Sequence, residues 1–416
     1  MIAGVVIVAM VMSSIFVVHY SKERSMIENL VGPTCANWKP PTRAPICDSN
    51  RILTTALRDE NCGVALKSPE SIAAKLIKLA DGSPFVFFRG TAAFFYANMF
   101  CFGDNTIGDE SIPQVVSNGD CHPENFGLME GINHDNLIWG VNDFDQSFHA
   151  PFTYDLTRGA TGFAVACMAR HDLSNIKETR EIRDIADRCD SFVNDFISSY
   201  VHVVQHTESL TLNDMFISGS ATLSRFPMVR NLFLDKADMS TPKAQRVWFQ
   251  KKGVDLSTEK FVRNTKLEPL PATSIAIWQA AVDQYVFHGP KQLARTGNTD
   301  PRNYFKVLDV ARKKGSGTGS VGLERYWILV QGNTKNDPLD DRIIEFKQET
   351  DSVLERYMGI QVSNQLEGQR VAEGEQLAYP YSNLFYSTPL SIYIYIYLSL
   401  HTHTHTYTHR LGKCNA

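Results

Sequence analysis

The segment SNGDCHPENFG, residues 117–127, combines an acid, an imidazole and a carboxamide in a stretch with two glycines and a proline. Glycine and proline interrupt regular secondary structure, so the segment is predicted to be a loop. Asp120 and Asn125 stand five residues apart in it, with His122 between them. A carboxylate and a carboxamide at this spacing can face one small volume, as the groups of a reaction centre must.

A second acidic segment follows this loop. The apolar run LIWGV, residues 137–141, is predicted to be a strand and leads into NDFDQSFHAPFTYDL. Two acidic clusters joined by a strand or hairpin resemble the halves of a phosphoryl-transfer centre, in which one Asp accepts a hydroxyl proton and an Asn and a second Asp hold Mg²⁺. Asp120, Asn125 and Asp143 supply the hard oxygen ligands that Mg²⁺ prefers. The alternative is a pair of ordinary turns, which Asp and Asn also favour.

A glycine-rich segment occurs late in the chain. GTGSVG, residues 317–322, precedes a predicted strand over Arg325–Val330. Gly317, Gly319 and Gly322 would let backbone N–H groups approach phosphates closely. The competing interpretation is a simple glycine-rich turn.

A lysine follows in the next predicted strand, residues 342–346 and their extension IIEFKQE. Lys347 matches the kinase arrangement in which a strand lysine grips the α- and β-phosphates. Glu349 or Glu355 is expected to pair with it. The alternative is an ordinary exposed lysine.

Two arginines follow apolar segments. Arg89 comes after PFVFF, which is predicted to be a buried strand, and Arg158 comes after TYDLT. Each either binds a phosphate or pairs with a buried carboxylate.

Together these motifs resemble known families. GDCHPEN matches the D-x-H-x-x-N catalytic loop of aminoglycoside and choline kinase-type phosphotransferases, which are similar to protein kinases in fold, and NDFD resembles their metal-binding Asp segment. The closer resemblance is to the mainly bacterial family called domain of unknown function 2252. FFRG, GDCHPENFG, NDFDQSFHAPFTYDLTR, GTGSVG, FKQE and QRVAEG follow the family's order over roughly residues 50–378.

The resemblance implies an α+β, two-lobed protein kinase-like fold that uses ATP and Mg²⁺. The implied roles are Asp120 as catalytic base, Asn125 and Asp143 as metal ligands, Asp145 as a further metal candidate, and Asp155 as a carboxylate that braces the loop. His122 is expected to order the loop through its ring nitrogens. The phosphotransferases have a His before Gly-Asp where this chain has Asn118, so the resemblance assigns that position no role.

The order of the motifs differs from that of ordinary kinases. There the glycine-rich loop and its lysine precede the catalytic loop, whereas here they follow it. We therefore expect a circularly rearranged kinase-like fold.

Composition bounds the function. The chain has 416 residues, of which 43% are hydrophobic and 21% charged, as in globular proteins large enough for two lobes. A net charge of -4 argues against a nucleic-acid partner.

The prediction is an ATP- and Mg²⁺-dependent phosphotransferase acting on a small-molecule or protein hydroxyl. The alternatives are a non-catalytic pseudokinase or nucleotide-binding module, and a nucleotidyl transferase that uses the same metal site; the oligomeric state is left open.

The amino-terminal segment is apolar. Residues 2–18 carry no charge and fall just short of the roughly 20 residues that span a bilayer. With Lys22 and Arg24 after the run, residues 1–20 are predicted to be a single-pass signal anchor in a membrane, with a cleaved signal peptide and secretion as the alternative. Residues 21–50 are predicted to be an irregular linker.

The cysteines suggest no metal site. No C-x-x-C pair occurs, which argues against zinc. Cys101, Cys121, Cys167 and Cys189 are predicted to be isolated thiols.

The carboxyl-terminal residues 379–416 form a low-complexity tail. SIYIYIYLSLHTHTHTYTHR alternates strictly, which fits a strand, but the preferred hypothesis is translated microsatellite DNA. Because the family's pattern breaks off near residue 378, the kinase-like domain is assigned to residues 51–378, and the chain is expected to be a truncated member.

Two helices are predicted from periodicity. Apolar residues recur every three or four positions over 174–206 and predict one apolar helix face. Its members are Ile182, Ile185, Cys189, Phe192, Phe196, Tyr200 and Val204. Residues 274–288 show a second helical pattern.

Overall fold

The computed structural model describes residues 52–62, 69–102, 111–130, 137–171, 179–206, 241–288, 305–315, 317–332, 337–358, 367–378 and 392–397. Helices and small antiparallel sheets are mixed in it, so the predicted α+β class is confirmed. The predicted apolar helix over residues 1–20 and the linker over 21–50 lie outside these ranges. Among the helices within them, none is long and apolar enough to cross a membrane.

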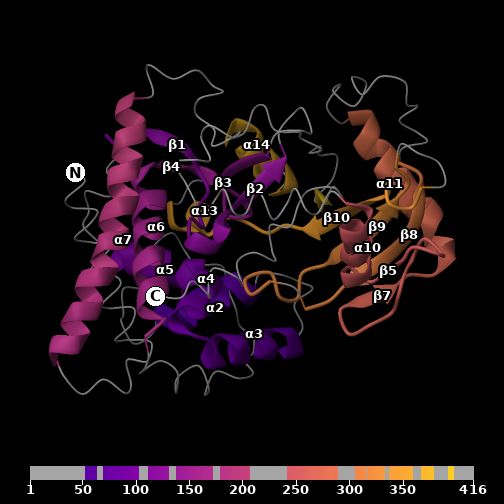
Figure 1. Cartoon of the computed structure of the whole chain (residues 1–416). Coiled ribbons are helices and arrows are strands. Elements are labelled where there is room, and N and C mark those ends of the chain that lie inside the picture. The colour runs from indigo at the N-terminus through magenta and orange to yellow at the C-terminus, as the bar shows by residue number, and fades with distance from the viewer. Residues whose placement is uncertain are drawn as a thin grey trace.

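One part of the molecule is mainly helical (Figure 1). Its helices are α2 (Ile52–Cys62), α3 (Pro69–Asp81), α4 (Pro84–Gly90), α5 (Ala92–Phe102), α6 (Thr153–Met168), α7 (Thr179–His206), α13 (Val353–Met358) and α14 (Glu367–Ala378). Helix α5, AAFFYANMFCF, is apolar nearly all round, as a helix at the centre of a core must be. It packs in one apolar cluster with α2, α3, α4 and α13.

Two short antiparallel sheets connect this helical part to the acidic segments. Strand β1 (Gln114–Ser117) pairs with β4 (Phe148–Pro151), and β2 (Phe126–Glu130) pairs with β3 (Leu137–Val141). The predicted strand over residues 137–141 is therefore confirmed, in the paired form. Both acidic segments lie at strand ends, because the first runs from β1 through the 3-10 helix η3 (Pro123–Asn125) to β2 and the second joins β3 to β4.

The other part is a five-stranded antiparallel sheet in the order β11-β10-β9-β8-β7. The strands are β7 (Leu267–Pro269), β8 (Val307–Lys313), β9 (Arg325–Val330), β10 (Arg342–Gln348) and β11 (Ile392–Tyr397), with the short pair β5 (Val254–Asp255) and β6 (Lys260–Phe261) beside them. Helix α10 (Pro242–Lys251) packs on one face through Trp248, and α11 (Ile275–His288), which follows η7 (Ala272–Ser274), packs on the other through Val282. The strands predicted over 325–330 and 342–346 and the helix over 274–288 are confirmed.

Part of the carboxyl-terminal tail belongs to this sheet. Strand β11 pairs along β10 and sets Tyr393 opposite Lys347. The strand interpretation is therefore correct for residues 392–397, while the microsatellite hypothesis stays a prediction. Residues 379–391 and 398–416 lie outside the described ranges.

The predicted buried strand PFVFF is wrong, because these residues form helix α4. The Ser83 hydroxyl accepts a hydrogen bond from the Val86 N–H, and Pro84 occupies the first turn, where its missing N–H costs nothing. A short continuous apolar run fits a buried strand and a buried helix equally well. The correction places Arg89 in the last turn of a helix.

The long helix predicted over 174–206 is confirmed as α7 from Thr179 to His206, and residues 174–178 lie outside the described ranges. Its predicted apolar face is partly wrong. Phe192 and Val204 are about half exposed. Ile185 and Cys189 are buried as predicted, and Phe196 and Tyr200 pack against the cluster shared with α6. The prediction missed Val193 and Ile197, which continue the buried face in steps of four.

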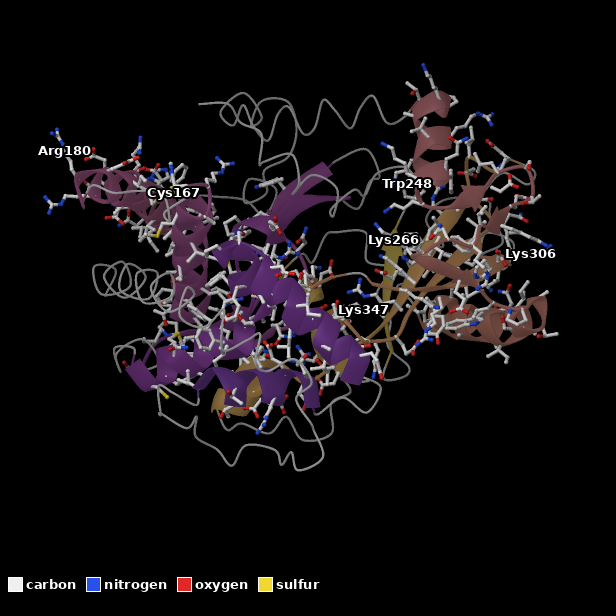
Figure 2. The ribbon with its side chains drawn as sticks, turned by 90° about the horizontal axis from the view of Figure 1, so that it is seen from below. Cys167, Arg180, Trp248, Lys266, Lys306 and Lys347 are labelled. Carbon is white, nitrogen blue, oxygen red and sulfur yellow. A yellow bond between two sulfur atoms is a disulfide. The ribbon has the colours of Figure 1, made fainter. Side chains whose placement is uncertain are left out.

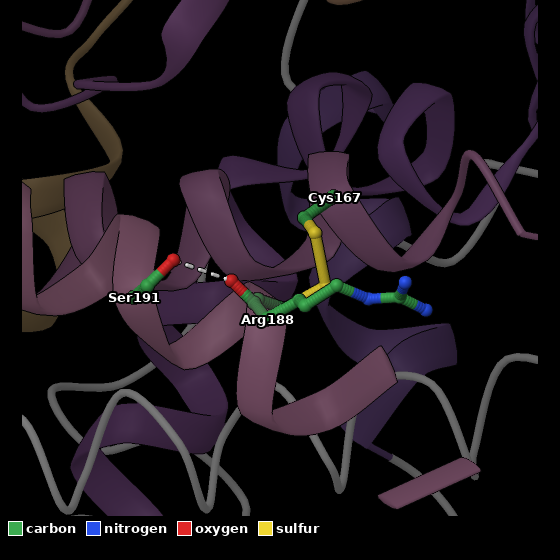
Figure 3. The surroundings of a disulfide bond; sticks show 4 residues. Cys167, Arg188 and Ser191 are labelled. Carbon is green, nitrogen blue, oxygen red and sulfur yellow. Dashed lines mark hydrogen bonds between the residues drawn. A yellow bond between two sulfur atoms is a disulfide. The ribbon is translucent and has the colours of Figure 1, made fainter. Parts of the chain in front are cut away.

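The prediction of isolated thiols is also wrong for three of the four cysteines. A disulfide joins Cys167 of α6 to Cys189 of α7 (Figure 3). Cys101 is disulfide-bonded as well, and Cys121 is a buried free thiol. Cys167 and Cys189 follow no motif spacing, so only the packing of α6 against α7 brings them together.

This cross-link predicts a measurable stabilisation. Replacing both Cys167 and Cys189 with Ser is expected to lower the free energy of unfolding by about 2–4 kcal/mol, because the bond restricts the unfolded chain. Urea unfolding followed by circular dichroism measures the change. Ser191→Ala on the same helix removes only an exposed hydrogen bond to the Arg188 carbonyl and serves as the control, expected within about 0.5 kcal/mol of wild type. A double variant as stable as the control would contradict the cross-link.

Candidate functional site

The first turn of α6 braces the loop between β1 and η3. The carboxylate of Asp155 accepts hydrogen bonds from the backbone N–H groups of Asn118 (2.6 Å) and Gly119 (2.9 Å). The predicted bracing role of Asp155 is therefore confirmed. Gly119 is required here because its φ is +76° and a Cβ atom would collide with the backbone carbonyl of Gln146.

Asp120, the predicted catalytic base, is held by a buried arginine. Its Oδ1 accepts from Arg158 Nε at 2.7 Å and lies 2.5 Å from Nη2. Of the two interpretations left open for Arg158, the structure supports the salt bridge. Burial raises the pKa of Asp120 to about 7, against the opposing effect of Arg158.

Arg158 itself is fully buried and fixed from several sides. Its guanidinium lies 4.4 Å from the ring centre of Phe88 and 5.0 Å from that of Phe95, and Nη2 donates to the Phe88 carbonyl at 3.1 Å. A cation so confined cannot follow the movements of its partner, so it fixes the orientation of the Asp120 carboxylate.

His122 lies on the other side of the same carboxylate. Its Nε2 is 3.7 Å from Asp120 Oδ2, and its ring packs edge-on against Phe85. Burial, with help from Arg89 and Arg158, lowers the pKa of His122 well below its ordinary range, so the ring is neutral. Its Nδ1 makes no hydrogen bond with the described residues, and its Nε2 lies beyond hydrogen-bond distance from Asp120 Oδ2. Ordering of the loop through the ring nitrogens therefore stays a prediction.

Hydrogen bonds join this loop to the second acidic segment. The Asn118 side chain donates to the carbonyls of Asn142 (3.2 Å) and Asp143 (3.1 Å). The Asn125 side chain donates to the Asp120 carbonyl at 3.0 Å, and the Asn142 N–H donates to the Asn125 carbonyl. Asn118, to which the resemblance assigned no role, therefore fixes the separation of the two segments.

Lys347 reaches the second segment from strand β10, between the two parts of the molecule (Figure 2). Its Nζ forms an ion pair with Asp145, lies 3.8 Å from Asp143 Oδ1 and 3.3 Å from Glu349 Oε1. The predicted convergence of Lys347 on Asp143 and its pairing with Glu349 are confirmed. An ammonium surrounded by three carboxylates forms the centre of the site.

Exposure divides these groups into two sets. Lys347 and Glu349 have only 2% of their side chains exposed, whereas Asp143 has 34% and Asp145 21%. Asp120 is intermediate at 18%. A ligand can therefore touch the three aspartates, while the lysine and glutamate support them from behind.

The carboxylates interact strongly because they are close together and shielded from water. Burial and the neighbouring Asp145 together raise the pKa of Glu349 to about 8, against the opposing effect of Lys347. Burial and the neighbouring Asp143 raise the pKa of Asp145. Burial alone would also raise the pKa of Asp143, but Lys347, a hydrogen bond from Asp145 and two arginines together bring it below its ordinary value. Glu349 and Asp145 therefore hold a proton more strongly than ordinary carboxylic acids do.

An arginine of α14 fixes the approach of the two parts. Arg370, in the motif QRVAEG, donates to the carbonyls of Ser147 (2.7 Å), Asp145 (2.9 Å) and Thr350 (2.9 Å). Sequence reasoning assigned no role to this residue, although its motif contributed to the resemblance. The segment after β10 is thereby tied to the segment before β4, which sets the distance from Lys347 to the aspartates.

The glycine-rich segment is the turn between β8 and β9. Gly317 and Gly322 have positive φ, at +77° and +86°. The Gly317 carbonyl accepts from Lys78 Nζ at 2.8 Å, and the Gly319 carbonyl accepts from Lys75 Nζ at 3.4 Å. Sequence reasoning missed both lysines, because nothing in helix α3 distinguishes them from ordinary surface residues. The predicted contact of this loop with phosphates stays a prediction.

Arg89 forms an ion pair with Glu124 of η3. Its pKa is lowered by burial, and the negative charges of Asp120 and Asp143 oppose that shift. The structure thus supports the ion-pair interpretation. Because 28% of the side chain is exposed, contact with a phosphate stays a prediction.

The predicted metal ligands are only partly brought together. Asp143 and Asp145 are neighbours, but the Asn125 amide bonds to the backbone of Asp120. Within the described ranges, no three His, Cys, Asp or Glu side chains form a group that could hold a metal ion. Metal binding by Asn125, Asp143 and Asp145 therefore stays a prediction.

Comparison with known proteins gives one match. The model of a family described as "Uncharacterized protein conserved in bacteria (DUF2252)" matches residues 67–389, more than half of the chain. The match continues past residue 378, where the pattern was expected to break off. No curated protein and no solved structure gives a match.

Asp120 makes stability depend on pH. Its ordinary pKa is 3.8, whereas burial raises it to about 7 in the folded chain, so the folded state holds the proton more strongly. This stabilising contribution is complete below about pH 4 and is lost as the pH rises to about 7. We expect the free energy of unfolding of wild type, relative to Asp120→Asn, to fall by about 2 kcal/mol between pH 5 and pH 7.

Urea unfolding of both proteins at several pH values measures this difference. The variant leaves the Arg158 charge without its carboxylate at every pH, so only the change with pH is informative. Glu349 is present in both proteins and cancels. Parallel pH profiles would show that Asp120 titrates near its ordinary value.

Proposed function

Because the chain belongs to the DUF2252 family, whose description names no activity, we propose its function from the site: an ATP- and Mg²⁺-dependent phosphotransferase with a circularly rearranged kinase-like fold. The acceptor is a hydroxyl group of a small molecule or a protein. One observation carries the proposal. Lys347 lies among Asp143, Asp145 and Glu349 although it is 202 residues from Asp145 in the chain.

The arrangement of strands around the site supports a kinase-like fold. In protein kinases a glycine-rich loop covers the phosphates, a nearby strand carries the lysine, and the catalytic loop and a metal-binding Asp complete the site. Here the glycine-rich turn joins β8 to β9, and the next strand, β10, carries Lys347. The antiparallel pair β2 and β3 separates Asn125 from Asp143. The parts correspond, but their order along the chain is rearranged.

The chemistry of the carboxylate group fits a divalent cation. Asp143 and Asp145 offer partly exposed hard oxygens, and three carboxylates surround one ammonium, so a bound cation would relieve their mutual repulsion. Asp143 and Asp145 would hold Mg²⁺. When bound, the ion would neutralise charge on the nucleotide phosphates.

The chain's own residues have separate tasks in the proposed reaction. Asp120 accepts the proton of the acceptor hydroxyl at Oδ2, because Oδ1 is held by Arg158. The hydroxyl oxygen forms a bond to the terminal phosphorus of ATP, and the bond from that phosphorus to the ADP oxygen breaks. Lys347 binds the phosphates after its ion pair with Asp145 opens, because the ammonium is covered while that pair is closed, and Glu349 orients it, as the kinase lysine and its glutamate do.

A non-catalytic nucleotide-binding module is the second candidate. It is favoured by the fact that Lys347 and Asp120 already have charged partners within the chain. Nucleotidyl transfer would use the same residues with attack at a different phosphorus. Both alternatives share the predicted binding of Mg-ATP, so binding and transfer have to be measured separately.

Mg-ATP binding is tested by thermal unfolding of the full chain. Binding to the folded state stabilises it by about 2.7 kcal/mol at a ligand concentration of 100 Kd, so wild type should unfold several degrees higher with millimolar Mg-ATP. Asp143→Asn should remove most of this shift. Asp184→Asn, an exposed position on α7, is the matched control and should keep it. A wild type that Mg-ATP does not stabilise argues against both the enzyme and the binding module.

Transfer is tested through Asp120. Asp120→Asn should keep the thermal shift yet lower the slow hydrolysis of ATP, with water as acceptor, by about 10²- to 10⁴-fold, because it removes the proton acceptor. Release of phosphate measures the rate. Binding without any hydrolysis in the wild type, even with added hydroxyl acceptors, would favour the non-catalytic module.

A further inference from the structure

Helix α3 holds the backbone of the glycine-rich turn. Lys78 Nζ donates to the Gly317 carbonyl at 2.8 Å, and Lys75 Nζ donates to the Gly319 carbonyl at 3.4 Å. Between them Thr318 packs on α4 so closely that a Cβ atom at Gly90 would lie 2.7 Å from its methyl group. The turn is thereby placed on the helical part of the molecule, on the side of Arg89.

The two lysines differ in how firmly they are held. Lys75 is 1% exposed and also donates to Glu60 (3.3 Å) and Asn61 (3.2 Å), so it is a structural anchor. Lys78 lies on the exposed side of the helix, and its bond to Gly317 is exposed. An exposed bond from an ammonium to a neutral carbonyl is readily exchanged, because water competes for both groups.

Lys78 and Arg89 lie close enough for their charges to interact. Burial lowers the pKa of Lys78, and the charge of Arg89 lowers it further. Arg89 in turn interacts with the charges of Asp120 and Asp143. The contacts agree with this placement: Lys78 bonds to Gly317, the neighbouring Thr318 packs on Gly90 beside Arg89, and Arg89 pairs with Glu124 of η3, which follows the Asp120 loop. The two cations therefore lie between the glycine-rich turn and that loop.

We propose that Lys78, together with Arg89, binds the terminal phosphate of the nucleoside triphosphate. The inference rests on the proposed function and adds a second cationic contact to Lys347. In the bound state Lys78 leaves the Gly317 carbonyl for a phosphate oxygen, since an ammonium binds an anion more strongly than a neutral carbonyl. Lys78 then contributes to the binding of ATP but not of ADP, because only ATP carries the terminal phosphate.

The test compares ATP with ADP by isothermal titration calorimetry of the full chain in the presence of Mg²⁺. Lys78→Gln removes the charge but leaves a donor for the Gly317 carbonyl. It should weaken ATP binding by about 10-fold or more and change ADP binding by less than about 2-fold, as expected for loss of one charged hydrogen bond. Lys78→Arg should restore most of the difference between ATP and ADP.

Lys306→Gln is the matched control. This exposed lysine lies at the far side of the sheet from Lys347 (Figure 2), so neither affinity should change. Thermal unfolding without nucleotide checks that each variant is folded. Lys347→Met serves as the positive control and should weaken both nucleotides.

The remaining outcomes distinguish a failure of the role proposed for Lys78 from a failure of the proposed function. If wild type binds ATP and Lys347→Met weakens it while Lys78→Gln does not, the role of Lys78 is wrong and the proposed function stands. If Lys78→Gln weakens ATP and ADP equally, the lysine only shapes the turn, and its role in binding the terminal phosphate is also wrong. If wild type binds neither nucleotide, both proposals fall.

Discussion

The site depends on a buried ammonium whose charge must be balanced where water is scarce. Lys347 is 2% exposed, and burying an unpaired charge costs several kcal/mol even after the protein relaxes. Asp143 and Asp145 come from the helical part, and Glu349 directly follows the strand that carries the lysine. Neither part can therefore be stable in this arrangement alone: without the aspartates the lysine would have to leave the interior, and without the lysine the three carboxylates would repel one another.

Helix α6 holds the loop that carries Asp120 in place through two side chains. Asp155 and Arg158 are three residues apart, so they lie on the same side of the helix, where one binds the loop backbone and the other binds the Asp120 side chain. The disulfide then joins the last turn of α6 to α7. The carboxylate is thus positioned by rigid, buried elements, and only its Oδ2 edge remains for other partners. A site supported in this way is preorganised, because little conformational freedom is left for a ligand to remove.

Local sequence patterns predicted most of the helices and strands near the site, but they could not predict contacts between residues far apart in the chain. The strands that carry Lys347 and precede the second acidic segment, the helix α7 and the bracing by Asp155 were all predicted from spacing or from the resemblance. The helix α4 was predicted wrongly because a continuous apolar run has no period. The disulfide and the contacts of Lys75, Lys78 and Arg370 join residues far apart in sequence, so no local pattern contains them. The resemblance to the family included the QRVAEG motif of Arg370, but it did not predict the contacts of this residue.

The order of the motifs, which differs from that of ordinary kinases, adds only a modest free-energy cost of loop closure. Closing a flexible loop costs only about 0.6 kcal/mol more for each doubling of its length. Joining Lys347 to Asp145 across 202 residues therefore costs about 2 kcal/mol more than joining them across about 25. The proposed rearrangement requires that the strand carrying Lys347 ends beside the segment that carries the aspartates. The Arg370 bonds to the carbonyls of Asp145, Ser147 and Thr350 meet this requirement, because they fix the segment leaving β10 against the segment entering β4. Convergence in space, rather than order along the chain, is what the chemistry of such a site demands.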